Sequence, residues 1–216
     1  MKLLAVDTAL GACSVALIED GRVLAHRHQL MDRGHAEALA PMVEESMRAA
    51  QITFAELDRL AVTTGPGTFT GQRVGIAFMR GLRVALGRPL TGVTTLAAMA
   101  EAAKAETGLG RAVALHDARR DEVYLEIGGL LSPAVLPFDQ ALQLLRELPA
   151  DAPIALAGTA APRACDALAT GFVLSTIRQP DALWVARLAA KANMVDAPPR
   201  PLYLRAPDAK LPATRS

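Results

Sequence analysis

An aspartate and a threonine, Asp7 and Thr8, stand where the first predicted strand ends, before the short turn at residues 9–11. A carboxylate at a strand end can hold the water shell of a metal, and the backbone N–H groups of a tight turn can bind phosphate. A structural explanation is simpler, because aspartate often caps a turn by accepting a hydrogen bond from nearby backbone. We therefore expect at most a weak nucleotide-binding site at Asp7 and Thr8.

A glycine-rich loop, Gly-Pro-Gly-Thr-Phe-Thr-Gly at residues 65–71, follows a predicted strand and opens a predicted helix. A phosphate-binding loop would lie at this position. However, the loop lacks the Gly-Lys-Ser/Thr ending of a P-loop, and its glycines do not match G-x-G-x-x-G. The pattern favours a structural turn in which Thr70 caps the helix.

The histidines and the candidate nucleophiles form no recognisable catalytic set. His26 and His28 point to one face of a predicted strand, but no third ligand is evident, and a metal site needs several convergent ligands. The serines lie in no nucleophile elbow, and Cys13 has no apparent base partner. The sequence therefore predicts no catalytic residue and no metal bound by this chain.

A charged turn, Asp-Ala-Arg-Arg-Asp-Glu at residues 117–122, connects two predicted strands. The residues allow two interpretations, a solvated hairpin loop or an acid-and-arginine patch that binds a partner or a phosphate. The sequence leaves both open.

Hydrophobic periodicity indicates the elements that position these residues. The predicted strands cover residues 2–6, 14–18, 23–28, 60–64, 112–115 and 123–127, and the predicted order has one more strand between the second and third helices. The predicted helices cover residues 35–50, 71–86, 95–106, 139–147, 160–169 and 181–193. Three strands followed by alternating helices and strands predict a layered α/β fold. The segment Gly108-Leu109-Gly110 suggests a division into halves at residues 1–108 and 109–197, with a proline-rich tail at 198–216.

Two of the predicted helices, 35–50 and 71–86, have two possible roles. Gly71 and Gly75 lie four residues apart and would let another backbone approach closely, and Phe78 and Met79 lie beside them. These side chains can pack on the protein's own sheet or form a surface for a partner. The periodicity alone does not separate the two roles.

Composition excludes several classes of protein. The net charge is +1 and aromatic residues make up 4%, which argues against tight RNA binding by this chain alone. The short apolar start does not resemble a signal peptide, and no run of apolar residues is long enough to span a membrane. We expect a cytoplasmic protein with no membrane association.

Several segments together resemble the bacterial TsaB (YeaZ) family of threonylcarbamoyladenosine synthesis. The most specific is the Gly-Pro-Gly-Thr-Phe-Thr-Gly loop. The match also includes Leu4–Thr8, Gly34–Glu37, Gly87–Leu90, Asp117–Arg120 and Pro201–Arg205. It covers nearly the whole chain and is strongest over residues 1–100. One departure is Ala9, where the family commonly has serine.

The resemblance implies an actin-like ATPase fold of the sugar kinase and Hsp70 superfamily, with two related halves of which the second is degenerate. It implies a heterodimer with TsaD, joined by the ATPase TsaE, that transfers threonylcarbamoyl to adenosine 37 of tRNA. This chain would be a required but non-catalytic subunit with no cofactor of its own. ATP and metal would be used by the partner subunits, and tRNA would be reached indirectly through the complex.

TsaD carries a His-x-x-x-His metal pair where this sequence has Thr95 and Met99. A hydroxyl and a thioether do not replace two imidazoles as ligands of a hard or borderline metal. This supports a non-catalytic role. The alternatives are a small-molecule kinase or nucleotide hydrolase of the same superfamily and, less favoured, a metalloprotease, which would need a ligand set such as H-E-x-x-H.

The resemblance also favours the interface role for the two helices. In the family, their equivalents pack against the same pair in TsaD as a four-helix bundle, and that surface can form a homodimer when TsaD is absent. The predicted contacts are His35, Leu39, Val43, Gly71, Gly75, Phe78 and Met79.

Overall fold

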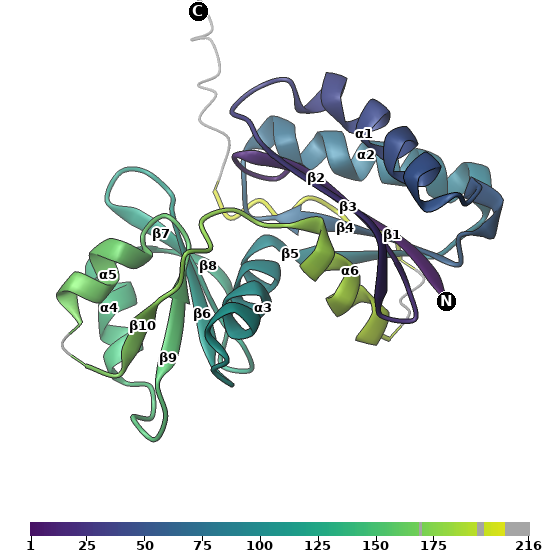
Figure 1. The fold of residues 1–216 in the computed structure, drawn as a ribbon. Helices are drawn as coiled ribbons and strands as arrows, with labels where there is room; N and C mark the ends of the chain where they lie inside the picture. The colour runs from purple at the N-terminus through teal and green to yellow at the C-terminus, as the bar shows by residue number, and fades with distance from the viewer. Residues whose placement is uncertain (169, 194–196, 206–216) are drawn as a thin grey trace, which may run out of the picture.

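A computed structural model describes residues 1–168, 170–193 and 197–205 and consists of two five-stranded sheets with helices around and between them (Figure 1). The first sheet has the order β3-β2-β1-β4-β5, and the second, read in the corresponding direction, has the order β8-β7-β6-β9-β10. The strands of the first sheet are β1 Lys2–Asp7, β2 Ala12–Glu19, β3 Arg22–Leu30, β4 Arg59–Gly65 and β5 Leu90–Thr94. Those of the second are β6 Ala112–Asp117, β7 Glu122–Ile127, β8 Leu131–Pro137, β9 Ile154–Ala157 and β10 Phe172–Leu174.

The two halves share one topology, which confirms the prediction of related halves. In each sheet a three-strand antiparallel meander is extended by two parallel strands. The helices are α1 His35–Ala50, α2 Phe69–Leu86, α3 Thr95–Thr107, α4 Phe138–Arg146, α5 Ala161–Ala167 and α6 Ala182–Lys191, with a short 3₁₀ turn at Phe54–Glu56. Most helices and strands of the second half are shorter than their counterparts in the first half, as expected of a degenerate repeat.

All six predicted helices are present within a few residues of their expected bounds, whereas the prediction missed β8, β9 and β10. Strand β8 contains Pro133 and Pro137, which are unusual in a strand, and it lies at a sheet edge where a missing N–H is tolerated. Strands β9 and β10 have only four and three residues, too few to show a period of two. None of the helices in the described residues is long and apolar enough to cross a membrane.

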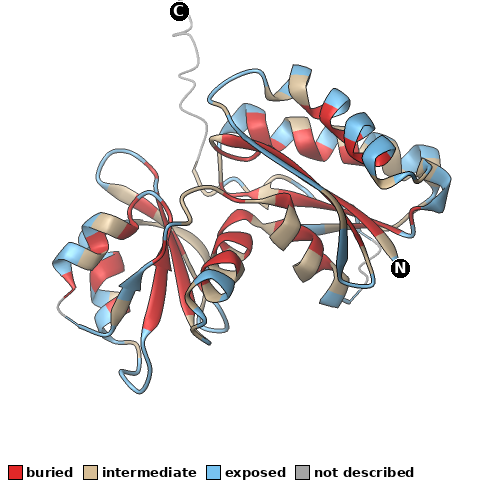
Figure 2. Ribbon diagram, in the orientation of Figure 1, coloured by how far each residue is buried: buried red, intermediate tan, exposed pale blue. Residues whose placement is uncertain are grey.

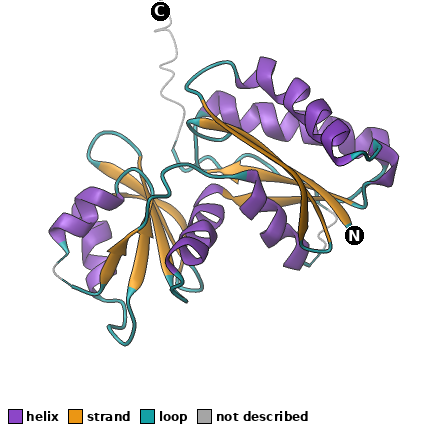
Figure 3. Ribbon diagram, viewed as in Figure 1, coloured by secondary structure: helices purple, strands orange, loops and turns teal. Residues whose placement is uncertain are grey.

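Helices α1 and α2 cover the outer face of the first sheet, and α4 and α5 cover the outer face of the second (Figure 3). The apolar stripe of α1, at Leu39, Val43 and Met47, packs on the sheet together with Ile76 and Met79 of α2. Figure 2 shows the result: the sheet-facing sides of these helices are buried and their outward sides are exposed.

The two halves exchange a helix. Helix α3 follows β5 of the first sheet but packs through Leu96, Met99 and Ala103 on β6 and β9 of the second sheet. Helix α6 follows β10 of the second sheet but packs through residues such as Val185 and Ala186 on β1, β2 and β4 of the first. The predicted boundary at residue 108 therefore separates the halves in sequence, but each sheet is completed by a helix from the other half.

The end of α6 is fixed to the first sheet by a buried arginine. Arg59, at the start of β4, is only 9% exposed, and its Nη1 donates to Ala189 O at 2.5 Å and to Ala192 O at 3.2 Å. Carbonyl groups at a helix C-terminus lack intrahelical partners and carry partial negative charge, so a guanidinium group there satisfies and stabilises them.

The described part of the predicted tail forms a strap, residues 199–205, that runs from the first half to the second. Arg80 of α2 donates to Pro199 O at 2.6 and 3.1 Å, and Leu202 N donates to Thr64 O at 2.7 Å. At its far end, Arg205 donates to Ala118 O at 2.8 Å. Residues 206–216 of the predicted tail lie outside the described residues.

Replacing Arg59 with methionine should destabilise the fold, because the C-terminal carbonyls of α6 lose their charged donor. We expect a loss of about 2–3 kcal/mol in the free energy of unfolding, measured by urea denaturation. Arg22→Met is the control, since Arg22 is an exposed residue whose only ion-pair partner in the described part of the chain is Glu19, and should change stability by less than about 0.5 kcal/mol. Equal effects of the two substitutions would contradict the assignment.

Candidate functional site

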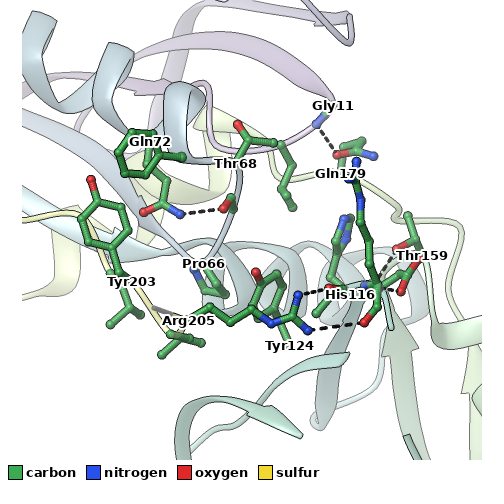
Figure 4. Close-up of a pocket in the computed structure, with 18 of the residues that line it drawn as sticks. Gly11, Pro66, Thr68, Gln72, His116, Tyr124, Thr159, Gln179, Tyr203 and Arg205 are labelled. Carbon is green, nitrogen blue, oxygen red and sulfur yellow. Dashed lines mark hydrogen bonds between the residues drawn. The ribbon is translucent and has the colours of Figure 1, made fainter. Parts of the chain in front are cut away.

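A cleft of about 1040 Å³ lies between the two halves (Figure 4). The first half contributes the β1–β2 turn at Leu10 and Gly11 and the loop at residues 66–69, together with Gln72. The second half contributes residues 116–119 from the end of β6 and Thr159, and the strap closes one side with residues 202–205. The cleft is therefore lined by residues of both halves and of the strap.

The glycine-rich loop packs directly on the β1–β2 turn. Thr68 N donates to Ala9 O at 2.8 Å, and a Cβ atom at Gly67 would lie 2.3 Å from Ala9 O. The backbones of the two segments are therefore packed directly against each other. The cap of α2 is Thr68, whose Oγ1 accepts from Gly71 N at 3.0 Å, so the predicted cap at Thr70 is wrong by two residues.

The hydroxyl group of Thr8 bonds to the backbone of α2 both as a donor and as an acceptor. Its Oγ1 donates to Gly71 O at 2.7 Å and accepts from Gly75 N at 3.0 Å. Asp7 is also buried, and its Oδ1 accepts from Thr63 Oγ1 at 2.6 Å and from Ala9 N at 3.2 Å. Neither residue lines the cleft, so the geometry gives Asp7 and Thr8 a structural role where the sequence suggested a weak nucleotide site.

Burial raises the pKa of Asp7 from its usual value to about 7, and the negative charge of Asp181 adds to the increase. The hydrogen bonds from Thr63 and Ala9 oppose it. Asp7 Oδ2 is buried without a hydrogen-bond partner among the described residues, which fits a carboxyl group that keeps its proton to a higher pH than usual.

On the opposite side of the cleft, His116 is 92% buried and its Nδ1 has no partner within the described part of the chain. Burial lowers the pKa of His116 to about 4, so the imidazole is neutral at pH 7. The turn that follows is unusual, because Arg119, Arg120 and Asp121 all have positive φ angles, between 57° and 63°. Asp117 fixes this turn by accepting from Arg119 N at 2.8 Å.

No group of three or more His, Cys, Asp or Glu side chains in the described residues is arranged to hold a metal. His26 pairs with Asp181 through Nε2 at 2.8 Å, and His35 Nε2 donates to Leu10 O at 2.9 Å. Thr95 and Met99 are fully buried in α3. These placements offer no metal-ligand set in the part of the protein that the structure describes.

The predicted interface residues need correction. Leu39, Val43, Met79, Gly71 and Gly75 are buried inside the protein, the three large side chains within its own core. The close contact that Gly75 allows is with Thr8 of the same chain, because a Cβ at position 75 would lie 2.7 Å from Thr8 Oγ1. Phe78 is half-buried against the same core, and half-buried His35 contacts the β1–β2 turn.

The outward faces of α1 and α2 carry other residues, which the sequence analysis did not select. The exposed small or apolar residues on these helices include Ala36, Ala40, Ala77, Gly81, Val84 and Ala85, and exposed charged residues such as Glu37, Glu44 and Glu45 lie on α1 as well. Val84 is 81% exposed, and a Cβ at Gly81 would meet no described atom within 4 Å. We call these small or apolar residues the small-residue face. The spacing of Ala77, Gly81 and Ala85 by four residues was the signal that could have revealed it.

Comparisons with known proteins support the resemblance seen in the sequence. The model of the family described as TsaD, tRNA N6-adenosine threonylcarbamoyltransferase, matches residues 27–144. The tRNA threonylcarbamoyladenosine biosynthesis protein TsaB of Escherichia coli K12 is 43% identical over 124 residues, which cover 57% of this chain and 53% of that protein. The chain thus matches only about half the length of that relative.

Solved structures agree over a longer stretch. YeaZ from Pseudomonas aeruginosa is 34% identical with a TM-score of 0.78, covering 94% of this chain and 99% of that one. Component A of (R)-2-hydroxyglutaryl-CoA dehydratase from Acidaminococcus fermentans has a TM-score of 0.53 at 10% identity, covering 88% of this chain and all of that one, and so shares only the fold.

Replacing Asp7 with asparagine should change how stability depends on pH. A carboxyl group with a pKa of about 7 when folded and about 4 when unfolded stabilises the folded state below pH 4 and loses that contribution as the pH rises to 7. Asparagine cannot ionise. The stability of the wild type relative to Asp7→Asn should therefore fall by about 2–3 kcal/mol between pH 5 and pH 8.

Urea denaturation of both proteins across this range measures the difference. His116 contributes in the opposite direction, because its lowered pKa adds stability that is lost as the pH falls from about 6.5 to 4, but it is present in both proteins and cancels. Exposed Asp166→Asn is the control and should show no such trend. A constant difference between wild type and Asp7→Asn would show that Asp7 is ionised throughout.

Proposed function

The chain belongs to the TsaB (YeaZ) family, and from this membership we propose that it is a non-catalytic subunit required for threonylcarbamoyl transfer to adenosine 37 of tRNA. Its fold is the actin-like α/β fold of that family and of the related ATPases. In this proposal it forms a heterodimer with TsaD and acts as its activator together with TsaE, in the cytoplasm. ATP and metal are used by the partner subunits, and this chain needs no cofactor of its own.

The small-residue face is the observation that carries the proposal. Alanine and glycine at positions 36, 40, 77, 81 and 85 leave the backbones of α1 and α2 open to close approach by helices of another chain. An exposed apolar surface of this kind on a helix pair is typical of a protein contact. A second helix pair packed there would form a four-helix bundle. The same face would support a homodimer when TsaD is absent.

The cleft chemistry supports a non-catalytic role. Thr8 is saturated by contacts to α2, the glycine-rich loop is closed against Ala9, and Asp7 does not line the cleft. An actin-like kinase or nucleotide hydrolase would need its acid and its phosphate-binding loops to face the nucleotide. The volume of the cleft is the one observation in favour of that alternative.

Reconstitution tests the function. TsaD, TsaE, tRNA and threonylcarbamoyl-adenylate are combined with and without this protein, and modified adenosine is measured. Modification only in its presence, with no ATP hydrolysis by the isolated chain, is the expected result. Equal modification without it, or ATP turnover by the chain alone, would favour the kinase or hydrolase alternative.

Gly81→Leu should abolish the heterodimer while leaving the fold intact. A Cβ at this exposed helix position meets no described atom within 4 Å, and leucine raises helix propensity by up to about 1 kcal/mol, so stability should not fall. The added side chain would, however, hold a partner helix away. Association with TsaD is measured by size-exclusion chromatography and calorimetry, and thermal unfolding checks the fold.

Two further variants separate the surface from the core. Gly128→Leu places the same side chain on an exposed turn of the second half, where it meets no described atom, and should bind TsaD normally. Gly75→Leu should instead lower stability, because its Cβ would clash with Thr8 Oγ1. Normal TsaD binding by folded Gly81→Leu would remove the small-residue face from the interface.

A further inference from the structure

The cleft collects aromatic side chains in a protein that has few. The chain has only two tyrosines, Tyr124 and Tyr203, and both line this cleft together with Phe69. They come from three distant segments, the start of α2, strand β7 and the strap. Figure 4 shows Tyr203 beside the first half and Tyr124 toward the second. Such convergence is unexpected if the cleft is only a gap between two halves.

Two of these rings are open to solvent at the mouth of the cleft. Phe69 is 52% exposed and Tyr203 is 45% exposed, and the rings stack with centroids 5.6 Å apart at an interplanar angle of 28°. Arg73 fixes the pair, because its guanidinium group lies 3.5 Å from the Phe69 centroid and its Nε donates to Tyr203 OH at 2.6 Å. We call these three residues the aromatic platform. An exposed, pre-ordered ring pair with an arginine matches the stacking surfaces that bind single-stranded nucleic acid.

Cations flank the aromatic platform from both halves. Arg33 and Arg119 line the cleft, are exposed, and have no ion-pair or side-chain hydrogen-bond partner among the residues that the structure describes. The two acids nearest to Arg119 in sequence have other partners, because Asp117 accepts from the backbone of its own turn and Asp121 Oδ1 accepts from Arg163 Nη1 at 2.6 Å. Free guanidinium groups on either side of a cleft can bind successive phosphates of a nucleic-acid chain.

Inside the cleft, buried polar atoms remain without a partner. Gln72 is 2% exposed and lines the cleft, and its Oε1 accepts no hydrogen bond within the described residues, although its Nε2 donates to Gly67 O at 2.9 Å. On the other side of the cleft, His116 Nδ1 is also buried without a hydrogen-bond partner among the described residues. A buried polar group without a partner is costly, so such atoms favour a ligand that supplies hydrogen bonds. The edge of a nucleobase does so.

We propose that the mouth of this cleft binds unpaired nucleotides of tRNA, with bases on the aromatic platform and phosphates at Arg33 and Arg119. The inference rests on the proposed function, since it adds a direct tRNA contact by this subunit. At 1.5 Å per helical residue, Phe69 lies roughly 12 Å from Ala77 and roughly 18 Å from Gly81 along α2, so one partner can cover the small-residue face while RNA reaches the aromatic platform.

The charges limit the strength of this contact. Asp32 and Asp117 also line the cleft, and Arg205 is paired with Glu122. Two free phosphate contacts give only a modest salt dependence, with a slope of about −1.4 for single-stranded nucleic acid. The contact therefore adds to binding by the assembled complex, in agreement with the near-neutral composition of the chain.

The test measures affinity for unmodified tRNA by the isolated protein and by its complex with TsaD. Phe69→Leu and Tyr203→Leu remove the aromatic rings but keep apolar volume, and each should weaken binding about tenfold. Phe69→Tyr is the matched control, because it keeps the ring and the bond between Arg73 and Tyr203, and it should bind as wild type. Arg33→Gln and Arg119→Gln should each reduce the salt slope by about 0.7, whereas the control Arg187→Gln on α6 should not.

Crosslinking of tRNA that contains 4-thiouridine, followed by mass spectrometry, should identify peptides that contain Phe69 or Tyr203. Wild-type affinity in both leucine variants, or crosslinks only elsewhere, would overturn the proposal. Leucine variants that lose ATP binding but keep tRNA affinity would also overturn it and mark the cleft as a free-nucleotide site. TsaD association is measured in parallel, so failure to form the complex counts against the proposed function while the isolated protein still decides RNA binding.

Discussion

The hydroxyl group of Thr8 donates to Gly71 O and accepts from Gly75 N, and both bonds require α2 to lie almost against the end of β1. Only glycine at 71 and 75 leaves room for this approach, because a Cβ at either position would lie within 2.7 Å of the Thr8 segment. The same contact sets which face of α2 is buried, brings Gly67 onto Ala9, and holds Phe69 at the cleft. The contact of the glycine-rich loop with Ala9 and the position of Phe69 at the cleft thus accompany one packing constraint.

The sequence predicted the helices well because each carries an apolar stripe with a period near 3.6, as at Leu39, Val43 and Met47. It also identified Gly71 and Gly75 as points of close approach. It did not reveal that the approaching group is the chain's own Thr8, because a glycine shows that space is needed but not what fills it. Likewise, the sequence suggests a chemical role for Asp7. Only the structure shows that its carboxylate is bonded to Thr63 and Ala9.

The cleft and its lining were beyond sequence reasoning for a different reason. Its residues come from the β1–β2 turn, the start of α2, the end of β6 and the strap, and no local pattern connects them. The duplicated topology places these segments together, since both halves direct the ends of their central strands toward the same gap. The fold therefore has a large cleft between its halves, and the side chains that line the cleft decide which ligand it can bind.

The exchange of α3 and α6 determines the order in which the molecule can be completed. During synthesis the first sheet is finished by residue 94, but the face that α6 covers stays apolar and open until residues 182–191 have left the ribosome. Until then the sheet also lacks the contacts of Arg59 with the end of that helix. Long-range closure of this kind slows folding and leaves apolar surface exposed on the nascent chain. The first sheet can therefore complete its packing only after residues 182–191 of the second half have been made.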